Sequence, residues 1–123
     1  MKHLDKWNKK RRNIAKIYNK LLNNLLIAKP EEPDYAKHIY HLYIIRCRKR
    51  DELQKYLTEN KIGTIIHYPI PVHLQEAYKD LGYTKGDFPI TEKYAKEILS
   101  LPMFPELTEE EIEYISKTIR NFR

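Results

Sequence analysis

The segment HIYHLYIIRCR, residues 38–48, constrains the fold more than any other part of the chain. It is rich in β-branched and aromatic residues, and it is too short and too uniformly apolar for an amphipathic helix. The sequence therefore predicts a strand here. Alternate residues of a strand point to opposite faces, and in this segment both faces carry apolar side chains. Both faces are thus expected to be at least partly buried.

Several other segments carry helical patterns. Residues 3–26 place apolar side chains three and four positions apart, and this spacing predicts a long amphipathic helix. Shorter helices are predicted over residues 51–60, 74–81, 87–99 and 108–122. Asp51 and Asp87 are the expected N-terminal caps of two of these helices. Thr108 and Glu111 are placed to form a capping box at the start of the last one.

Two further strands complete the predicted fold. IGTIIHY, residues 62–68, has the composition of a second strand, and SLPMFP, residues 100–105, is predicted to be an edge strand because its prolines interrupt pairing. The succession of strand, helix and strand would make one βαβ-like unit, although the sequence leaves the strand direction open. We therefore expect a two-layer α+β fold: a small antiparallel or mixed sheet packed with helices, plus the long N-terminal helix.

Positive charge is concentrated at the N-terminal end of the chain. The formal net charge is +6, and the first twenty residues contain these basic side chains: Lys2, Lys6, Lys9, Lys10, Arg11, Arg12, Lys16 and Lys20. The charged face of such a helix is either exposed to solvent alone or binds nucleic acid or a protein partner. Most of the ten tyrosines fall on predicted apolar stripes, so nucleic acid is not the favoured partner.

Residue content excludes several kinds of site. Cys47 is the only cysteine, so neither a disulfide framework nor a cysteine metal cluster can form. The histidine spacings match no recognised set of metal ligands, and no metal is expected. No apolar run approaches the roughly 18 residues that cross a bilayer, and the charged N-terminal segment does not resemble a secretory signal. We therefore expect a cytoplasmic protein without a membrane partner.

The segment GTIIHYPIPVHLQ, residues 63–75, is the part of the chain best suited to contact a ligand. Pro69 and Pro71 hold it extended, which fixes the direction of neighbouring side chains at low entropic cost. Imidazole and phenol groups can hydrogen-bond phosphate or sugar hydroxyls. His67, Tyr68 and His73 are therefore candidate binding residues. The residues alone equally allow the corner to do no more than turn the chain.

A family resemblance begins at this corner. The C-terminal part of the DegT/DnrJ/EryC1/StrS aminotransferases resembles residues 64–122, TIIHYPIPVHLQEAYKDLGYTKGDFPITEKYAKEILSLPMFPELTEEEIEYISKTIRNF. HYPIPVH and LSLPMFPELTEEEI are specific in combination. The family's long connecting helix resembles LDKWNKKRRNIAKIYNKLL, and its first small-domain strand and helix resemble HIYHLYIIRCRKRDELQKYLTENKIGT. The resemblance thus covers nearly the whole chain, in family order.

The resemblance implies part of a fold-type I enzyme that depends on pyridoxal phosphate (PLP) and aminates keto-sugar nucleotides. Residues 1–28 would be the connecting helix and residues 29–123 the small C-terminal domain, together one structural unit. The family's Schiff-base lysine and phosphate cradle belong to a large N-terminal domain, and no lysine here lies in that motif. The resemblance therefore implies no catalytic residue on this chain, PLP in the complete enzyme, and no cofactor on this chain alone.

The resemblance also implies roles at the corner. His67 and Tyr68 match a segment that borders the active site and contacts the nucleotide-sugar. His73 matches a neighbour of that site, and Pro69 and Pro71 would be the scaffold of the corner.

Partners and function follow from the same resemblance. His41 matches a histidine that recurs in the family's first strand, and it is expected to be a structural support. The expected partners are a large PLP-binding domain or a second subunit, with a homodimer as one arrangement, and a nucleotide-sugar in the complete enzyme. The expected function is that of a sugar-aminotransferase domain in cell-surface polysaccharide or deoxyaminosugar biosynthesis, inactive alone. The chain would then be an excised piece, a gene fragment or half of a split enzyme. The alternative is a stand-alone binding or assembly module that uses residues 3–26.

Overall fold

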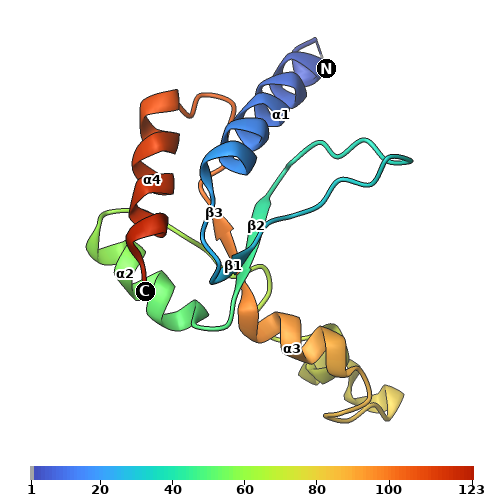
Figure 1. Ribbon diagram of the computed structural model, residues 1–123. Coiled ribbons are helices and arrows are strands. Elements are labelled where there is room, and N and C mark those ends of the chain that lie inside the picture. The colour runs from blue at the N-terminus through green and yellow to red at the C-terminus, as the bar shows by residue number, and fades with distance from the viewer. Residues whose placement is uncertain (1) are drawn as a thin grey trace.

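Residues 2–123 are described by a computed structural model. A three-stranded antiparallel sheet with strand order β1-β2-β3 lies at the centre (Figure 1). The elements along the chain are α1 (Leu4–Leu21), β1 (Ile27–Ala28), β2 (Tyr43–Cys47), α2 (Arg50–Glu59), the 3-10 turns η1 (Val72–Leu74) and η2 (Glu76–Leu81), α3 (Pro89–Glu97), β3 (Ile98–Leu101) and α4 (Glu109–Asn121). The α+β prediction with a long N-terminal helix is confirmed.

Strand β2 is the middle strand and forms the centre of the core. Tyr43 lies opposite Leu101 and Ile45 lies opposite Leu99 in the antiparallel ladder with β3. On its other edge β2 pairs with β1, where Cys47 lies opposite Ile27. Tyr43, Ile45 and Cys47 are buried, and the two residues between them are half-buried. The expectation that both faces of this strand are covered is therefore correct.

Helices α1 and α4 lie side by side above the sheet (Figure 1). Tyr18 joins α1 to the sheet, since its ring centre lies 4.8 Å from that of Tyr43 and its hydroxyl donates to the carbonyl oxygen of Pro102 at 3.0 Å. Burial raises the pKa of the Tyr18 hydroxyl, which keeps it a neutral donor. Leu4 and Trp7 are each 43% exposed, so the first turns of α1 extend beyond the core.

The strands differ from the prediction where the backbone cannot stay extended. Only Tyr43–Cys47 of the predicted strand 38–48 is strand, because Tyr40 adopts a left-handed conformation with φ of 52°. The predicted strand 62–68 is reduced to one bridge between Ile65 and Ser100. It adds no parallel strand, and the βαβ-like unit does not form. The helix predicted over residues 74–81 consists of 3-10 turns.

The capping box of α4 is confirmed. The Thr108 hydroxyl accepts a hydrogen bond from the Glu111 backbone N–H at 3.3 Å, and the Glu111 carboxylate accepts one from the Thr108 backbone N–H at 2.8 Å. Hydrogen bonds from the backbone and side chain of Thr108 lower the pKa of Glu111. The two residues thus satisfy donors that the first turn of a helix leaves unpaired.

The other two predicted caps are wrong. Helix α2 begins one residue before Asp51, whose carboxylate accepts a hydrogen bond from Nε of Arg50 at 2.5 Å. Helix α3 begins at Pro89, and the Asp87 carboxylate accepts a hydrogen bond from the Thr84 backbone N–H at 2.7 Å. In both places a nearby donor competes with the helix N-terminus for the carboxylate.

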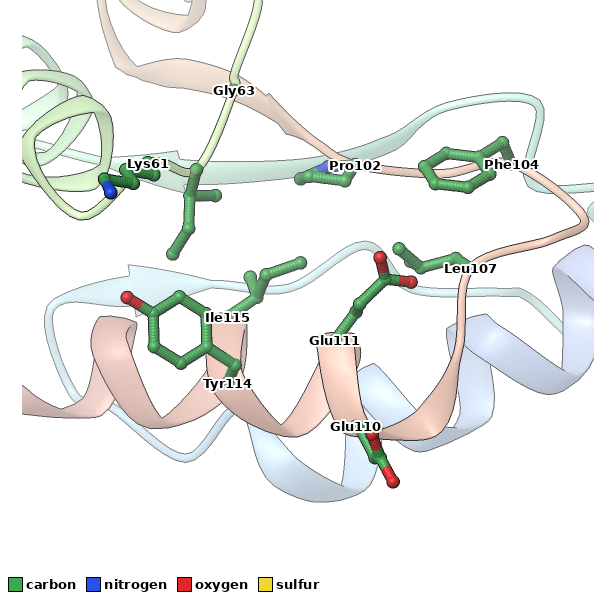
Figure 2. Close-up of a pocket in the computed structure, with 10 residues that line it drawn as sticks. Lys61, Gly63, Pro102, Phe104, Leu107, Glu110, Glu111, Tyr114 and Ile115 are labelled. Carbon is green, nitrogen blue, oxygen red and sulfur yellow. The ribbon is translucent and has the colours of Figure 1, made fainter.

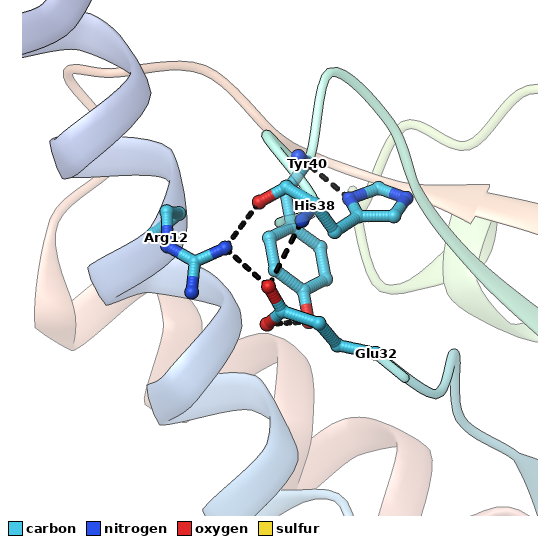
Figure 3. Close-up of polar contacts among 4 residues, drawn as sticks. All are labelled: Arg12, Glu32, His38 and Tyr40. Carbon is cyan, nitrogen blue, oxygen red and sulfur yellow. Dashed lines mark hydrogen bonds and ion pairs between the residues drawn. The ribbon is translucent and has the colours of Figure 1, made fainter. Parts of the chain in front are cut away.

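The loop between β1 and β2 is tied to α1 by a polar cluster (Figure 3). The Arg12 guanidinium donates to the Glu32 carboxylate at 2.6 Å and also to the carbonyl oxygen of His38. Glu32 accepts a further hydrogen bond from the His38 backbone N–H at 2.9 Å. The hydrogen bond from Arg12 is the main reason that the pKa of Glu32 is lowered. The cluster fixes the path of the chain into Tyr40 and β2.

Helix α3 and the 3-10 turns form an arm at the end of the sheet opposite α1 (Figure 1). From residue 63 to residue 94 no residue is buried. The arm therefore lies outside the core formed by α1, α2, α4 and the sheet. Across residues 2–123, no helix combines the length and the apolar character needed to cross a membrane.

Candidate substrate-contacting corner

The predicted corner lies between a bridge to β3 and the first 3-10 turn. The Ile65 backbone N–H donates to the carbonyl oxygen of Ser100 at 3.3 Å, and the Ser100 N–H donates to that of Ile65 at 2.8 Å. The chain then passes through His67 and Tyr68, which are joined by a cis peptide bond, and Pro71 precedes η1. Tyr68 is 70% exposed. Its ring is thus available to another molecule.

His67 is held by a serine that sequence reasoning missed. Nδ1 of His67 lies 2.9 Å from Oγ of Ser100, which is buried in β3. Both residues line a cavity of about 170 Å³ together with Thr64 and Met103. Oγ1 of Thr64 is a buried polar atom without a partner in the described part of the chain. Buried polar atoms usually have hydrogen-bond partners. The cavity lining therefore includes a polar atom that forms no hydrogen bond within this part of the chain.

His73 points into the arm instead of towards solvent. Its Nε2 lies 3.1 Å from Oε1 of Glu92, and the side chain is only 8% exposed. The same carboxylate oxygen accepts a hydrogen bond from the Gly86 backbone N–H at 2.7 Å. The ring of Phe88 packs beside the imidazole at 4.7 Å between centres. No hydrogen bond between His67 and His73 occurs within residues 2–123. The geometry favours a supporting role for His73.

Glu92 should make the arm sensitive to acid. The Gly86 N–H is the main cause that lowers the pKa of Glu92, with His73 as a further cause and desolvation opposing both. A lowered pKa in the folded state means that the ionised carboxylate stabilises the fold. This contribution is complete above the ordinary glutamate pKa of 4.5 and is lost as pH falls through the lowered value.

We expect the Gly86 amide resonance in NMR spectra to shift over the same acid range, because its hydrogen bond to the carboxylate weakens on protonation. In Glu92→Gln that titration should disappear. A Gly86 resonance that titrates equally in both proteins would contradict the assignment.

A hollow of about 370 Å³ lies on the arm next to His73. Aromatic and aliphatic side chains share its lining: Val72, His73, Tyr78, Leu81, Tyr83, Phe88 and Thr91. Tyr83 and Phe88 meet edge to face at 5.1 Å between ring centres. The hollow is a mainly apolar surface, and the His73 imidazole on its wall is paired with Glu92.

His41 lies just before β2 and is exposed. It has no hydrogen-bond partner within the part of the chain that the structure describes. Its expected role as a structural support remains a prediction.

A further hollow, of about 410 Å³, lies between α4 and the segment after β3 (Figure 2). Leu107 and Ile115 face this space from the α4 side, and Pro102 borders it from the other side. Glu111 also borders it, but its carboxylate is engaged in the capping box. Gly63 and Pro102 line both this hollow and the His67 cavity, so the two are neighbours. Lys61, Glu110 and Tyr114 also line this hollow, so it combines an apolar floor with polar groups at its border.

The residues present do not fit a covalently held PLP. A Schiff-base lysine is activated by desolvation or by a neighbouring cation in a pocket, whereas every lysine of the chain is exposed. None of the three glycines belongs to a glycine-rich phosphate loop. In residues 2–123 no group of three or more histidine, cysteine, aspartate or glutamate side chains could hold a metal ion. That this chain binds no cofactor alone stays a prediction.

Known proteins match this chain over almost its whole length. A model of the DegT/DnrJ/EryC1/StrS aminotransferase family matches residues 1–120. The chain is 48% identical over 123 residues to the pleiotropic regulatory protein of Geobacillus stearothermophilus. It is 37% identical over 122 residues to the dTDP-3-amino-3,6-dideoxy-alpha-D-galactopyranose transaminase of Aneurinibacillus thermoaerophilus. These matches cover 98% and 99% of the chain but 33% of each relative. The chain thus spans about a third of the length of the curated relatives it matches.

The fold is also found in solved structures. The crystal structure of S. venezuelae DesV in complex with a ketimine intermediate matches with a TM-score of 0.92 and 35% sequence identity. The match covers 96% of this chain and 32% of the DesV chain.

Proposed function

The chain belongs to the DegT/DnrJ/EryC1/StrS aminotransferase family, and from this premise we propose that it forms the small C-terminal domain of a sugar-nucleotide aminotransferase. The observation that carries the proposal is that the chain matches DesV over almost its whole length while spanning only part of the longer protein. A relative named as a dTDP-sugar transaminase matches in the same way. We propose a nucleoside-diphosphate keto-sugar as the substrate of the complete enzyme.

In this proposal the chain supplies one wall of the substrate site. His67 and Tyr68 contact the nucleotide-sugar, and Pro69 and Pro71 hold the corner in place. The exposed Tyr68 ring and the anchored His67 ring support this division of roles. His73 acts through its pair with Glu92, which holds the 3-10 turn against α3.

The remaining parts of the site come from a partner. Residues 1–28 connect to a large PLP-binding domain, and α1 presents Leu4 and Trp7 beyond the core as surface for it. The family is PLP-dependent, and PLP supplies the electron sink for amino transfer when the complete enzyme binds it. This chain orients the sugar and excludes water from one side.

A chimera tests the proposal. The C-terminal third of the A. thermoaerophilus transaminase is replaced by this chain, and turnover of that enzyme's own substrate is measured. We expect the chimera to bind PLP and to turn over substrate. His67→Ala should lower kcat/KM about 10- to 100-fold, the effect of removing one hydrogen bond to a charged group.

Lys55→Ala is the control, because Lys55 is exposed on α2, away from the corner and from residues 1–28, and it should leave kcat/KM unchanged. The absorption spectrum of bound PLP shows that the chimera is assembled. An assembled chimera with no more turnover than the remaining two-thirds of the relative alone would overturn the proposal.

A further inference from the structure

Ser100 is a buried polar residue next to the corner. It is 4% exposed, it lies opposite Ile44 in the ladder between β2 and β3, and its backbone also exchanges two hydrogen bonds with Ile65. Its hydroxyl lies 2.9 Å from Nδ1 of His67. The strand thus fixes the hydroxyl, and the hydroxyl in turn fixes one edge of the imidazole.

The direction of the shared proton follows from counting donors and acceptors. A serine hydroxyl is one donor, and a neutral imidazole carries one N–H and one bare nitrogen. If Nδ1 of His67 carried the proton, the Ser100 oxygen would accept a hydrogen bond from it. The buried O–H of Ser100 would then have no acceptor within residues 2–123. An unsatisfied buried donor is costly. If Ser100 donates to a bare Nδ1, the Ser100 O–H and the Nδ1 lone pair each have a hydrogen-bond partner.

We infer that Ser100 donates to Nδ1 and thereby holds neutral His67 in the tautomer that carries its proton on Nε2. The Nε2–H group has no acceptor in the described part of the chain, and Nε2 is not one of the buried polar atoms that lack a partner. It is therefore accessible from outside. Ser100 is a positioning residue, and His67 is a directed hydrogen-bond donor.

A directed N–H donor selects a ligand with an acceptor oxygen. A phosphate oxygen or a sugar hydroxyl meets this requirement, whereas a ligand group that can only donate does not. This assignment of Nε2–H to a nucleotide-sugar oxygen rests on the proposed function. The tautomer itself does not, because it is a property of the ligand-free chain.

Long-range ¹H–¹⁵N NMR of the histidine rings tests the tautomer in the 123-residue chain, at a pH where the rings are neutral. Exposed His3 is the internal reference. We expect His67 to show the Nε2–H pattern, with a tautomer ratio about tenfold or more above that of His3, the effect of avoiding one unsatisfied buried donor. In Ser100→Ala the His67 ratio should fall to that of His3, and Ser100→Thr should restore it.

A wild-type spectrum with the proton on Nδ1 of His67 would overturn the inference, even if the Ser100 variants failed to fold. So would a Ser100→Ala spectrum with an unchanged ratio. If His67→Ala left kcat/KM of the chimera unchanged while His67 showed the predicted tautomer, only the proposed function would be contradicted. The two failures are thus distinguishable.

Discussion

Ile45→Ala is expected to lower the free energy of unfolding by about 2–5 kcal/mol. Ile45 has no exposed surface and lies at the middle of the central strand, opposite the fully buried Leu99. Removing its side-chain carbons loses their transfer free energy and leaves a cavity that the surrounding core can fill only in part. Domains of this size are stable by about 5–15 kcal/mol, so chemical denaturation should show a large shift of the midpoint.

Ile90→Ala is the matched control, because Ile90 is 69% exposed on α3. It should change the free energy of unfolding by no more than about 0.5 kcal/mol. Equal effects of the two substitutions would mean that β2 is not the centre of the core.

Arg50→Met should lower the free energy of unfolding by about 2–4 kcal/mol. Arg50 is 9% exposed, and its guanidinium donates to the carbonyl oxygens of Ala95 at 3.3 Å and Ile98 at 3.2 Å. Methionine keeps much of the volume but donates nothing, so these carbonyl groups at the end of α3 lose a partner. The effect is measured by chemical denaturation, with hydrogen exchange of α3 amides as a local readout.

Arg48→Met is the control for charge, because Arg48 is an exposed arginine two residues away. The Arg50 variant should exchange α3 amides faster, whereas the Arg48 variant should not. If Arg50→Met were no more destabilising than Arg48→Met, the guanidinium would not hold the end of α3.

Local signals in the sequence predict local structure well. The capping box at Thr108 depends on residues three apart, and it is present as predicted. Strand β2 was recognisable because its own composition favours extended structure, but its start was not, since the left-handed turn at Tyr40 depends on a cluster with α1. Asp51 is a residue type that often caps helices, but its carboxylate accepts a hydrogen bond from Arg50 instead.

The candidate site shows the same division between near and distant contacts. The sequence located His67 and Tyr68 at a rigid corner and gave no sign of Ser100, because that contact joins positions 33 residues apart. His73 belongs to the same motif, but its partner Glu92 lies 19 residues away on α3. Whether a histidine faces a ligand or a carboxylate depends on such pairings, and these follow from strand register and helix placement rather than from local spacing.

Residues 63–94, which include the 3-10 turns and most of α3, contain no buried residue. Segments that bury little apolar surface open at a small fraction of the free energy needed to unfold the whole chain. The sheet and the three helices packed with it can stay intact while η2 and the turn after it rearrange. The domain thus combines a stable core with a surface segment whose conformation can adjust to the molecule that binds it.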